Sequence, residues 1–372
     1  MKLVRNIFRI IVGLVFIFSG FVKGVDPLGT VYRMDDYFIV FGTDWAIPFA
    51  LYLTIFLCTL EFILGISLLF NLWIRVSAWP LLLLMIFFTI LTFFDAVFNL
   101  VPDCGCFGEA VKLTNVQTFL KNLVLMAMIM PIFIARKKFR GFLASKKESI
   151  VLLIFTLLFS GMSVYSYRHL PPLDFMEWKV GNQVNTRSSE PVKFFLTFEN
   201  NKTGEVKEYL SPNYPWNDSV WMSEWKFVSQ RVIDPNNTQA MVLRIEDEAG
   251  NDLTGNIIDN PDFQFIFVAY DLAATEKEAF LKILPFYKKA EAEGYSFICL
   301  TSTDFPGIRK FRLANGTAFE YYSADDVVLK TMVRSNPGLI LLKNGKVLGK
   351  WHYNDLPLYE DVIKSGGQKV RK

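Results

Sequence analysis

The chain has 372 residues, of which 52% are hydrophobic, and its mean hydropathy is +0.29. These values are too high for an ordinary soluble chain and indicate a membrane protein with a soluble part. The net charge of +3, without a basic run interleaved with aromatics, argues against a nucleic-acid partner. Two distant histidines and four cysteines argue against a His-rich metal site and against a disulfide framework.

The first part of the chain contains stretches long enough to cross a bilayer, which takes about 20 residues. Five such apolar stretches lie near residues 7–24, 46–70, 77–99, 115–135 and 149–167. No small-residue cleavage site follows the first, so we interpret it as a retained helix and not as a signal peptide. The predicted fold class of this part is a membrane α-helical bundle of about five transmembrane helices in a lipid bilayer.

Charges in the connecting segments predict the orientation of the helices. Basic side chains precede the first stretch and fill the connection at 136–147, whereas the alternate connections are mainly acidic. Positive residues favour the cytoplasmic side of a membrane. We therefore predict a bacterial inner-membrane protein with a cytoplasmic N-terminus, and with the loop at 102–109 and the C-terminal domain in the periplasm.

The rest of the chain mixes charge and aromatics like a globular domain. Alternating apolar runs separated by turn signals predict strands at 191–200, 204–210, 225–233 and 240–255. The later pattern predicts a buried strand at 263–270, a helix at 275–294, a strand at 295–302 and a hairpin at 338–351. Such an alternation is typical of an α/β domain. We divide the chain into a four-helix membrane domain (1–140), a fifth helix with its tether (141–170), a β-rich segment (171–239) and the α/β domain (240–372).

The loop Pro102–Glu109 holds two of the four cysteines, Cys104 and Cys106, on either side of Gly105. A redox dithiol needs a thiolate and a second sulfur close enough to resolve a mixed disulfide. Gly105 permits backbone angles that a residue with a Cβ resists, and the small ring of a Cys104–Cys106 bond favours exchange. Three interpretations stay open at this point: a redox pair, a static local clamp, and ligation of a metal shared with another molecule.

The other two cysteines, Cys58 in an apolar stretch and Cys299 in a predicted buried strand, are typical small core residues. The chain therefore has no second dithiol to take electrons from the first. A redox pair would pass its electrons to a quinone-like carrier, a small thiol or a partner protein. No cofactor is evident, because the sequence carries no quinone signature and no metal-ligand cluster.

Three charged side chains lie within or at the ends of the apolar stretches: Lys23, Glu61 and Asp95. Charges inside a membrane usually face the interior of a bundle and have a partner. Lys23 and Asp95 both fall near the predicted outer ends of their helices. We hypothesise that they pair near the dithiol, where Lys23 favours a thiolate and Asp95 relays a proton. For all three residues the alternative is a structural polar contact between helices.

Three segments of residues 1–140 resemble the MauE/DoxX redox-associated membrane proteins: SGFVKGVDP (19–27), Glu61 followed by Gly65, and PDCGCFGE (102–109). The Cys-Gly-Cys-Phe-Gly loop is the specific part of this resemblance. The resemblance implies a four-helix bundle that supports disulfide formation or electron transfer outside the inner membrane.

Residues 240–365 are similar to a thioredoxin-like domain of the membrane-tethered thiol-reductase or peroxiredoxin type, through VLRIEDEAGNDLTG, FQFIFVAYD and SNPGLILLKNGKVLGKW. Asn336-Pro337 falls where that fold carries its cis-proline, which implies partner or peptide binding at these two residues. The sequence departs from the family where Cys-x-x-Cys is expected, because Asp271–Thr275 stands there instead. The resemblance thus implies the fold and partner binding, without dithiol chemistry of the domain's own.

Two functional hypotheses follow from these observations. In the first, Cys104 and Cys106 exchange disulfides with a periplasmic protein partner, which the Cys-less thioredoxin-like domain holds. In the second, the protein is a non-enzymatic membrane scaffold or assembly subunit, whose cysteines form a clamp and whose periplasmic domain binds a partner. The first predicts a bond that responds to external thiols, and the second predicts normal function after both cysteines are replaced by serine.

Overall fold

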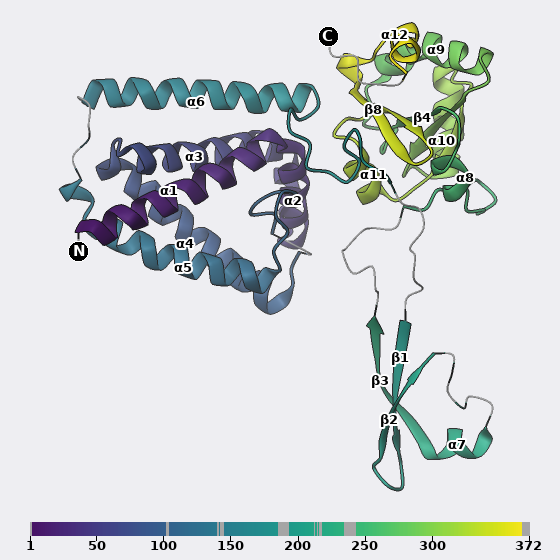
Figure 1. The fold of residues 1–372 in the computed structure, drawn as a ribbon, viewed down its shortest axis with the longest axis horizontal. Helices are drawn as coiled ribbons and strands as arrows, with labels where there is room; N and C mark the ends of the chain where they lie inside the picture. Colours follow the sequence, from purple (N-terminus) through teal and green to yellow (C-terminus); the bar gives the residue numbers. More distant parts are fainter. Residues whose placement is uncertain are drawn as a thin grey trace.

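The computed structural model describes residues 2–101, 104–139, 141, 145–184, 193–211, 213, 215, 218–233 and 243–366. A bundle of long helices forms the N-terminal part, and an α/β domain lies beyond one end of it (Figure 1). A separate three-stranded sheet comes between them in the sequence.

Five helices in the described part of the chain are long and apolar enough to cross a membrane. They are α1 (Lys2–Val25), α3 (Ala50–Phe70), α4 (Ile74–Phe98), α5 (Asn115–Ile134) and α6 (Ser145–Arg168). Apolar side chains such as Leu83, Leu120 and Leu157 are exposed on their outer faces. Such exposure is normal against lipid, so the predicted membrane helical bundle is confirmed and its outer surface contacts the bilayer.

Helices α1 and α3 pack closely through small residues. A Cβ atom on Gly20 would lie 2.8 Å from the carbonyl oxygen of Cys58, and one on Gly65 would lie 2.6 Å from the backbone nitrogen of Ile17. Small residues of this kind let two backbones approach each other inside a membrane. The contact brings the C-terminal half of α1 directly against the middle of α3.

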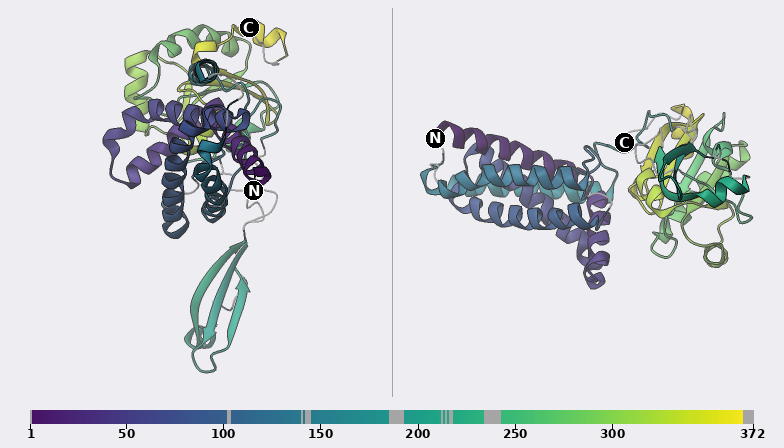
Figure 2. Two further views of the ribbon diagram at one scale, coloured as in Figure 1. Left: turned by 90° about the vertical axis from the view of Figure 1, so that its left-hand side faces the viewer. Right: turned by 90° about the horizontal axis from the view of Figure 1, so that it is seen from below.

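Helix α2 (Pro27–Val40) crosses the end of the bundle that faces the α/β domain (Figure 2). It begins at Asp26, whose side chain accepts a hydrogen bond from the Gly29 amide at 3.1 Å, and Pro27 occupies the first turn. A 3₁₀ helix, η1 (Asp44–Phe49), then leads into α3. This segment was predicted to be a connection between the first two membrane helices, so α2 is an addition to the predicted fold.

The C-terminal domain contains a five-stranded sheet with the order β6-β5-β4-β7-β8. Its strands are β4 (Gln264–Val268), β5 (Ser296–Thr301), β6 (Glu320–Ser323), β7 (Gly338–Lys343) and β8 (Lys346–His352). The central strand β4 pairs in parallel with β5 and antiparallel with β7. Alternate residues of β4 enter two different cores, Phe265 and Phe267 on one face and Ile266 and Val268 on the other.

Helices cover both faces of this sheet. They are α8 (Thr254–Ile258), α9 (Lys277–Ala292), α10 (Phe305–Asn315), α11 (Asp326–Met332) and α12 (Tyr359–Lys364), with a 3₁₀ turn η3 (Tyr353–Asp355). The predicted strands at 263–270 and 295–302, the helix at 275–294 and the hairpin at 338–351 correspond to β4, β5, α9 and β7–β8. The elements α8, β6, α10, α11 and α12 were not predicted by residue range.

The strand predicted at 240–255 is wrong for its described residues. Residues 240–242 lie outside the described residues, and 243–253 form only isolated bridges of Glu246 with Asp252 and Ser323. The Asp247 side chain accepts hydrogen bonds from the backbone of Ala249 and Asn251, both at 2.9 Å. This local turn competes with strand pairing, as short polar side chains commonly do.

The three-stranded sheet is antiparallel, with the order β2-β1-β3. It consists of β1 (Lys193–Asn200), β2 (Val206–Leu210) and β3 (Trp225–Ile233), with the short helix α7 (Ser219–Glu224) before β3. Trp221 stacks on Trp225 with ring centroids 5.8 Å apart and meets the edge of Phe198 at 4.8 Å. These aromatic contacts hold α7 against the sheet.

The C-terminal domain contacts α2 through buried polar groups. Arg334 Nε lies 2.9 Å from Asp26 Oδ2 and 3.0 Å from Asp26 Oδ1, and the Arg334 side chain is only 4% exposed. Beside this pair the hydroxyls of Tyr32 and Tyr270 lie 3.1 Å apart. Asp26, which caps the N-terminus of α2, therefore also holds the C-terminal domain to the end of the bundle.

Replacement of Arg334 by alanine should loosen this contact. Loss of one partner of a buried charge pair at an interface costs about 2–5 kcal/mol, so hydrogen–deuterium exchange of α2 should become faster. Arg309→Ala is the matched control, because Arg309 forms an exposed ion pair with Glu248 within the same domain. Equal exchange of α2 in both variants would show that the Arg334–Asp26 pair does not hold the domain.

Candidate functional site

The loop between α4 and α5 brings the two thiols together. Gly105 has a φ angle of 60° and Gly108 one of 51°, a backbone region that residues with a Cβ rarely adopt. The Gly108 amide donates to the Gly105 carbonyl oxygen at 3.0 Å and closes a turn. Cys104 and Cys106 are free, half-buried thiols whose Sγ atoms lie 3.5 Å apart.

The environment shifts the pKa values of the two thiols in opposite directions. A hydrogen bond from Cys104 lowers the pKa of Cys106 to about 6, and the charges of Lys121 and Lys23 act in the same direction against the effect of burial. The same hydrogen bond and burial raise the pKa of Cys104 well above its ordinary value. At neutral pH, Cys106 is therefore the thiolate and Cys104 the thiol.

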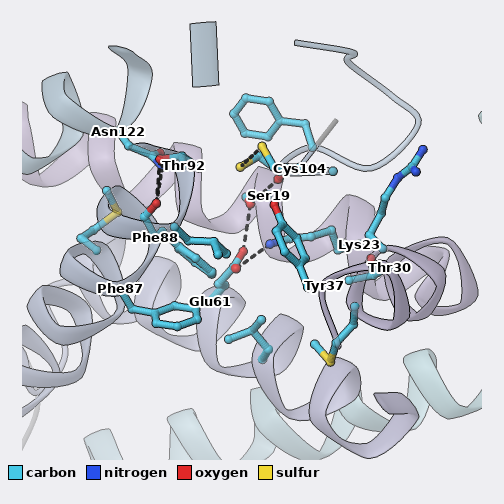
Figure 3. Close-up of a pocket in the computed structure, with 18 of the residues that line it drawn as sticks. Ser19, Lys23, Thr30, Tyr37, Glu61, Phe87, Phe88, Thr92, Cys104 and Asn122 are labelled. Atoms are coloured by element: carbon cyan, nitrogen blue, oxygen red, sulfur yellow. Dashed lines mark hydrogen bonds and ion pairs between the residues drawn. The ribbon is translucent and has the colours of Figure 1, made fainter. Parts of the chain in front are cut away.

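A buried polar chain connects the helix bundle to this loop. Lys23 Nζ of α1 lies 2.5 Å from Glu61 Oε1 of α3, and their side chains are 7% and 2% exposed. The Ser19 hydroxyl lies 2.9 Å from Glu61 Oε2 and 2.8 Å from the Cys106 carbonyl oxygen, and it donates to one of them. The Lys23–Glu61 pair thus lies one hydroxyl away from the backbone of Cys106 (Figure 3).

The hypothesis that Lys23 pairs with Asp95 is wrong, because Lys23 pairs with Glu61. The glycine contact presses α1 against α3 and places the ammonium group beside Glu61. Asp95 instead accepts a hydrogen bond from the Tyr37 hydroxyl of α2, with 2.6 Å between the oxygens. Its other carboxyl oxygen, Oδ1, is buried without a hydrogen-bond partner among the described residues. The proton-relay role of Asp95 stays a prediction.

The two sulfurs border a cavity of about 680 Å³ among α1, α2, α3, α4 and α5. Its wall is largely apolar and includes Phe87 and Phe88 of α4 (Figure 3). Polar groups gather in the same lining, among them the Lys23–Glu61 pair. Sequence reasoning missed this cavity, because it forms only where α2 crosses the bundle.

Further polar side chains line the cavity from α4 and α5. Asn122 Nδ2 donates to Thr92 Oγ1 at 3.0 Å and to the Phe88 carbonyl oxygen at 3.3 Å. Lys121 Nζ lies 4.5 Å from the centroid of the Phe107 ring in the cysteine loop. A molecule in the cavity would therefore meet hydrogen-bond donors beside the thiols and aromatic rings elsewhere.

The predicted partner-binding residues lie close to the contact between the domains. The Asn336–Pro337 peptide bond is cis, Pro337 is buried, and Asn336 Nδ2 donates to the Asp271 carbonyl oxygen at 2.9 Å. Nearby, Arg334 Nη2 lies 3.8 Å from Glu109 Oε1 at the end of the cysteine loop. Partner binding at Asn336 and Pro337 stays a prediction.

Cys58 and Cys299 are fully buried, as expected for core residues. Among the described residues, no group of three or more His, Cys, Asp and Glu side chains is arranged to hold a metal ion.

The fold and the site together define a polytopic membrane protein whose helical bundle carries a dithiol loop beside an apolar cavity. Residues 1–135, a little over a third of the chain, match the model of the membrane-protein family described as methylamine utilisation protein MauE. The resemblance to MauE is thus confirmed for this part. No curated protein and no solved structure matches the chain.

The acidity of Cys106 can be measured by alkylation. In a Cys58→Ala, Cys299→Ala background, the rate of reaction of Cys106 with iodoacetamide should reach half its maximum near pH 6, because its pKa is about 6. Cys104→Ala should raise this midpoint, since the donated hydrogen bond is lost, and Cys104→Ser should raise it less. A midpoint near the ordinary thiol value of about 8.5 in all variants would contradict the assignment.

The buried ion pair should respond differently to single and double substitution. Lys23→Met or Glu61→Gln leaves one charge uncompensated and should cost about 3–5 kcal/mol, whereas the Lys23→Met, Glu61→Leu double variant should recover most of this stability. The readout is labelling of Cys58, which is buried at the α1–α3 contact, during heating in detergent. Lys112→Met, at an exposed ion pair with Glu109, is the matched control and should behave as wild type.

Proposed function

We propose that this protein carries out thiol–disulfide exchange through Cys104 and Cys106 at the outer face of a bacterial inner membrane. The observation that carries the proposal is that the Sγ atoms of Cys104 and Cys106 lie 3.5 Å apart, with the pKa of Cys106 lowered and that of Cys104 raised. A structural clamp has no need of a thiolate stabilised by cations, whereas exchange chemistry depends on one. The residues 1–135 that match a membrane-protein family contain the whole of this loop.

The proposed step begins from the oxidised loop. A thiolate of a partner dithiol attacks Cys104 Sγ, a mixed disulfide forms, and the Cys104–Cys106 bond breaks. Cys106 leaves with the electron pair, because the sulfur with the lower pKa is the better leaving group. The second partner thiolate then attacks the partner sulfur of the mixed disulfide and releases Cys104. The partner loses two electrons to the loop, one of its two protons goes to Cys104, and the other goes to solvent, because Cys106 leaves as a thiolate.

We infer the orientation from the distribution of charge. Basic side chains such as Arg9 and Arg136 lie at the end of the bundle away from the cysteine loop, and the loop and the C-terminal domain share the other end. A cytoplasmic N-terminus, with the loop and C-terminal domain in the periplasm, agrees with the preference of positive residues for the cytoplasmic side.

We propose that residues 240–372 form a thioredoxin-like domain that has lost its dithiol. The central β4, the parallel neighbour β5, the antiparallel hairpin β7–β8 and the Asn336-Pro337 dipeptide before β7 support this proposal. Ala273 and Ala274, in the place of Cys-x-x-Cys, are exposed. The domain would hold the partner protein beside Asn336 and Pro337 while the loop supplies the sulfurs.

A scaffold or assembly subunit is the second candidate function. It is favoured by one observation, namely that the C-terminal domain carries only the buried Cys299 and is held to α2 by the Arg334–Asp26 pair. In that case the cysteine pair would be a fixed clamp, and replacement of both by serine would leave function intact.

The redox response of the loop separates the two candidates. Purified protein is equilibrated in glutathione buffers of different ratio, and free thiols are then labelled with a maleimide that adds mass. Exchange predicts that the oxidised fraction of the Cys104–Cys106 pair follows the buffer. A pair that stays oxidised in every buffer would establish the clamp and contradict the proposal.

A single-cysteine variant identifies the sulfur that carries the mixed disulfide. Cys106→Ala treated with glutathione disulfide should retain one glutathione on Cys104, because the second sulfur that would displace it is absent. Wild type should retain none under the same conditions. Cys58 and Cys299 serve as internal controls, since both are buried and should stay unmodified.

A further inference from the structure

The cavity beside the dithiol continues toward the lipid-facing side of the bundle. A second apolar hollow of about 600 Å³ shares Phe38, Thr43, Leu53 and Phe56 with it. This hollow is lined in addition by aromatic residues of η1 and α3, namely Trp45, Phe49 and Tyr52, all of them exposed. The two spaces together lead from the sulfurs to the membrane surface of α3.

The exchange reaction needs an acceptor for the two electrons that the loop receives from the partner. Once Cys104 and Cys106 are reduced, two electrons must leave before the loop can act again. Cys58 and Cys299 cannot take them as a pair, because one lies in the membrane bundle and the other in the C-terminal sheet. The acceptor must come from outside the chain, and the apolar cavity lets it come from the lipid phase.

We propose that the cavity binds a lipid-soluble quinone, which oxidises the Cys104–Cys106 dithiol. This inference rests on the proposed function, and it names the second substrate of the same site. A planar ring suits the aromatic wall formed by Phe87 and Phe88, an apolar tail suits the adjoining hollow, and the ring oxygens suit the donors at the polar end.

The donors that would meet the ring oxygens are already held in place. Lys23 Nζ is fixed by Glu61 and lies 5.7 Å from the centroid of the Phe88 ring, so it reaches the wall against which the ring would lie. Lys121, which also lines the cavity, has its Nζ atom 4.5 Å from the centroid of the Phe107 ring in the cysteine loop. Donors fixed in advance stabilise the negative charge that develops on the ring oxygens during reduction.

The electrons and protons of the step balance. The Cys106 thiolate adds to a ring carbon and forms a C–S bond. Cys104 then gives up its proton and attacks Cys106 Sγ, so that the S–S bond forms, the C–S bond breaks, and the electron pair stays on the ring. One proton of the two new hydroxyl groups comes from the Cys104 thiol and the other from solvent, because Cys106 begins the step as a thiolate. The dithiol is thereby oxidised to a disulfide and the quinone is reduced to a quinol.

The experiment uses the full-length protein in detergent. The protein is reduced, freed of reductant and mixed with decylubiquinone without oxygen, and quinol formation is followed by absorbance. Wild type should form one quinol for each dithiol, with loss of both maleimide-reactive thiols. The Cys104→Ala, Cys106→Ala variant should form none, which controls for direct reaction of the quinone with other groups.

A pair of tryptophan substitutions on α4 tests the cavity itself. Leu91 lines the cavity, whereas Leu83 is 62% exposed on the lipid-facing side of the same helix. Leu91→Trp should slow quinol formation by about tenfold or more, since a displaced ring loses its alignment with the sulfur. Leu83→Trp should react as wild type. In a Cys104→Ala background, where no Cys104–Cys106 disulfide can form, bound decylubiquinol should also shield Cys106 from maleimide; Leu91→Trp should abolish this shielding and Leu83→Trp should not.

The outcomes separate this inference from the proposed function. Normal exchange with glutathione but no quinol formation would overturn the quinone inference and leave the exchange function standing. Equal rates in Leu91→Trp and Leu83→Trp would overturn the assignment of the cavity, as would recovery of tightly held acyl lipid that decylubiquinone fails to displace. A pair inert to both glutathione and quinone would remove the exchange function and this inference together.

Discussion

The buried ion pair between Lys23 and Glu61 is the interaction on which the rest of the site depends. Two charges inside a bundle with apolar outer faces are tolerated only when each satisfies the other. The pair forms because Gly20 and Gly65 allow α1 and α3 to approach each other closely. The Ser19 hydroxyl then lies between the carboxylate and the Cys106 carbonyl oxygen, so the contact that closes the bundle also borders the cysteine loop.

Helix α2 and its capping residue Asp26 are the second feature on which the site depends, because their side chains contact both the C-terminal domain and the membrane bundle. Asp26 caps the helix and accepts the ion pair from Arg334, and Tyr32 meets Tyr270 one to two turns later. Tyr37, further along, binds Asp95 and lines the cavity. The C-terminal domain and the membrane cavity are therefore coupled to the cysteine loop through the same helix, from two different sides.

Local signals in the sequence were sufficient for the membrane helices, the β7–β8 hairpin at Asn344-Gly345 and the closeness of the Cys104 and Cys106 sulfurs, since each depends on neighbouring residues. Features that depend on packing between distant segments were not accessible. Lys23 was paired with Asp95 because both were predicted near the outer ends of their helices. The contact at Gly20 and Gly65, which brings Lys23 to Glu61, depends on how α1 packs against α3. The cavity likewise exists only because α2, which was taken for a loop, crosses the bundle. At 243–253, the Asp247 turn replaced a strand that alternation alone favoured.

The different pKa values of the two sulfurs favour one order of attack and departure in the proposed exchange. Cys106 has the lower pKa of the two, because Cys104 donates a hydrogen bond to it and the charges of Lys121 and Lys23 act in the same direction. The loop that carries both sulfurs ends at Glu109, beside Arg334 of the C-terminal domain. In the proposed exchange, a partner held by that domain attacks Cys104, and the sulfur that it displaces is the Cys106 thiolate. A symmetric pair of exposed thiols would lack this order, because either sulfur could then be attacked and either could leave. In the proposed reaction, the position of the loop between the C-terminal domain and an apolar cavity would separate the entry of electrons from their exit.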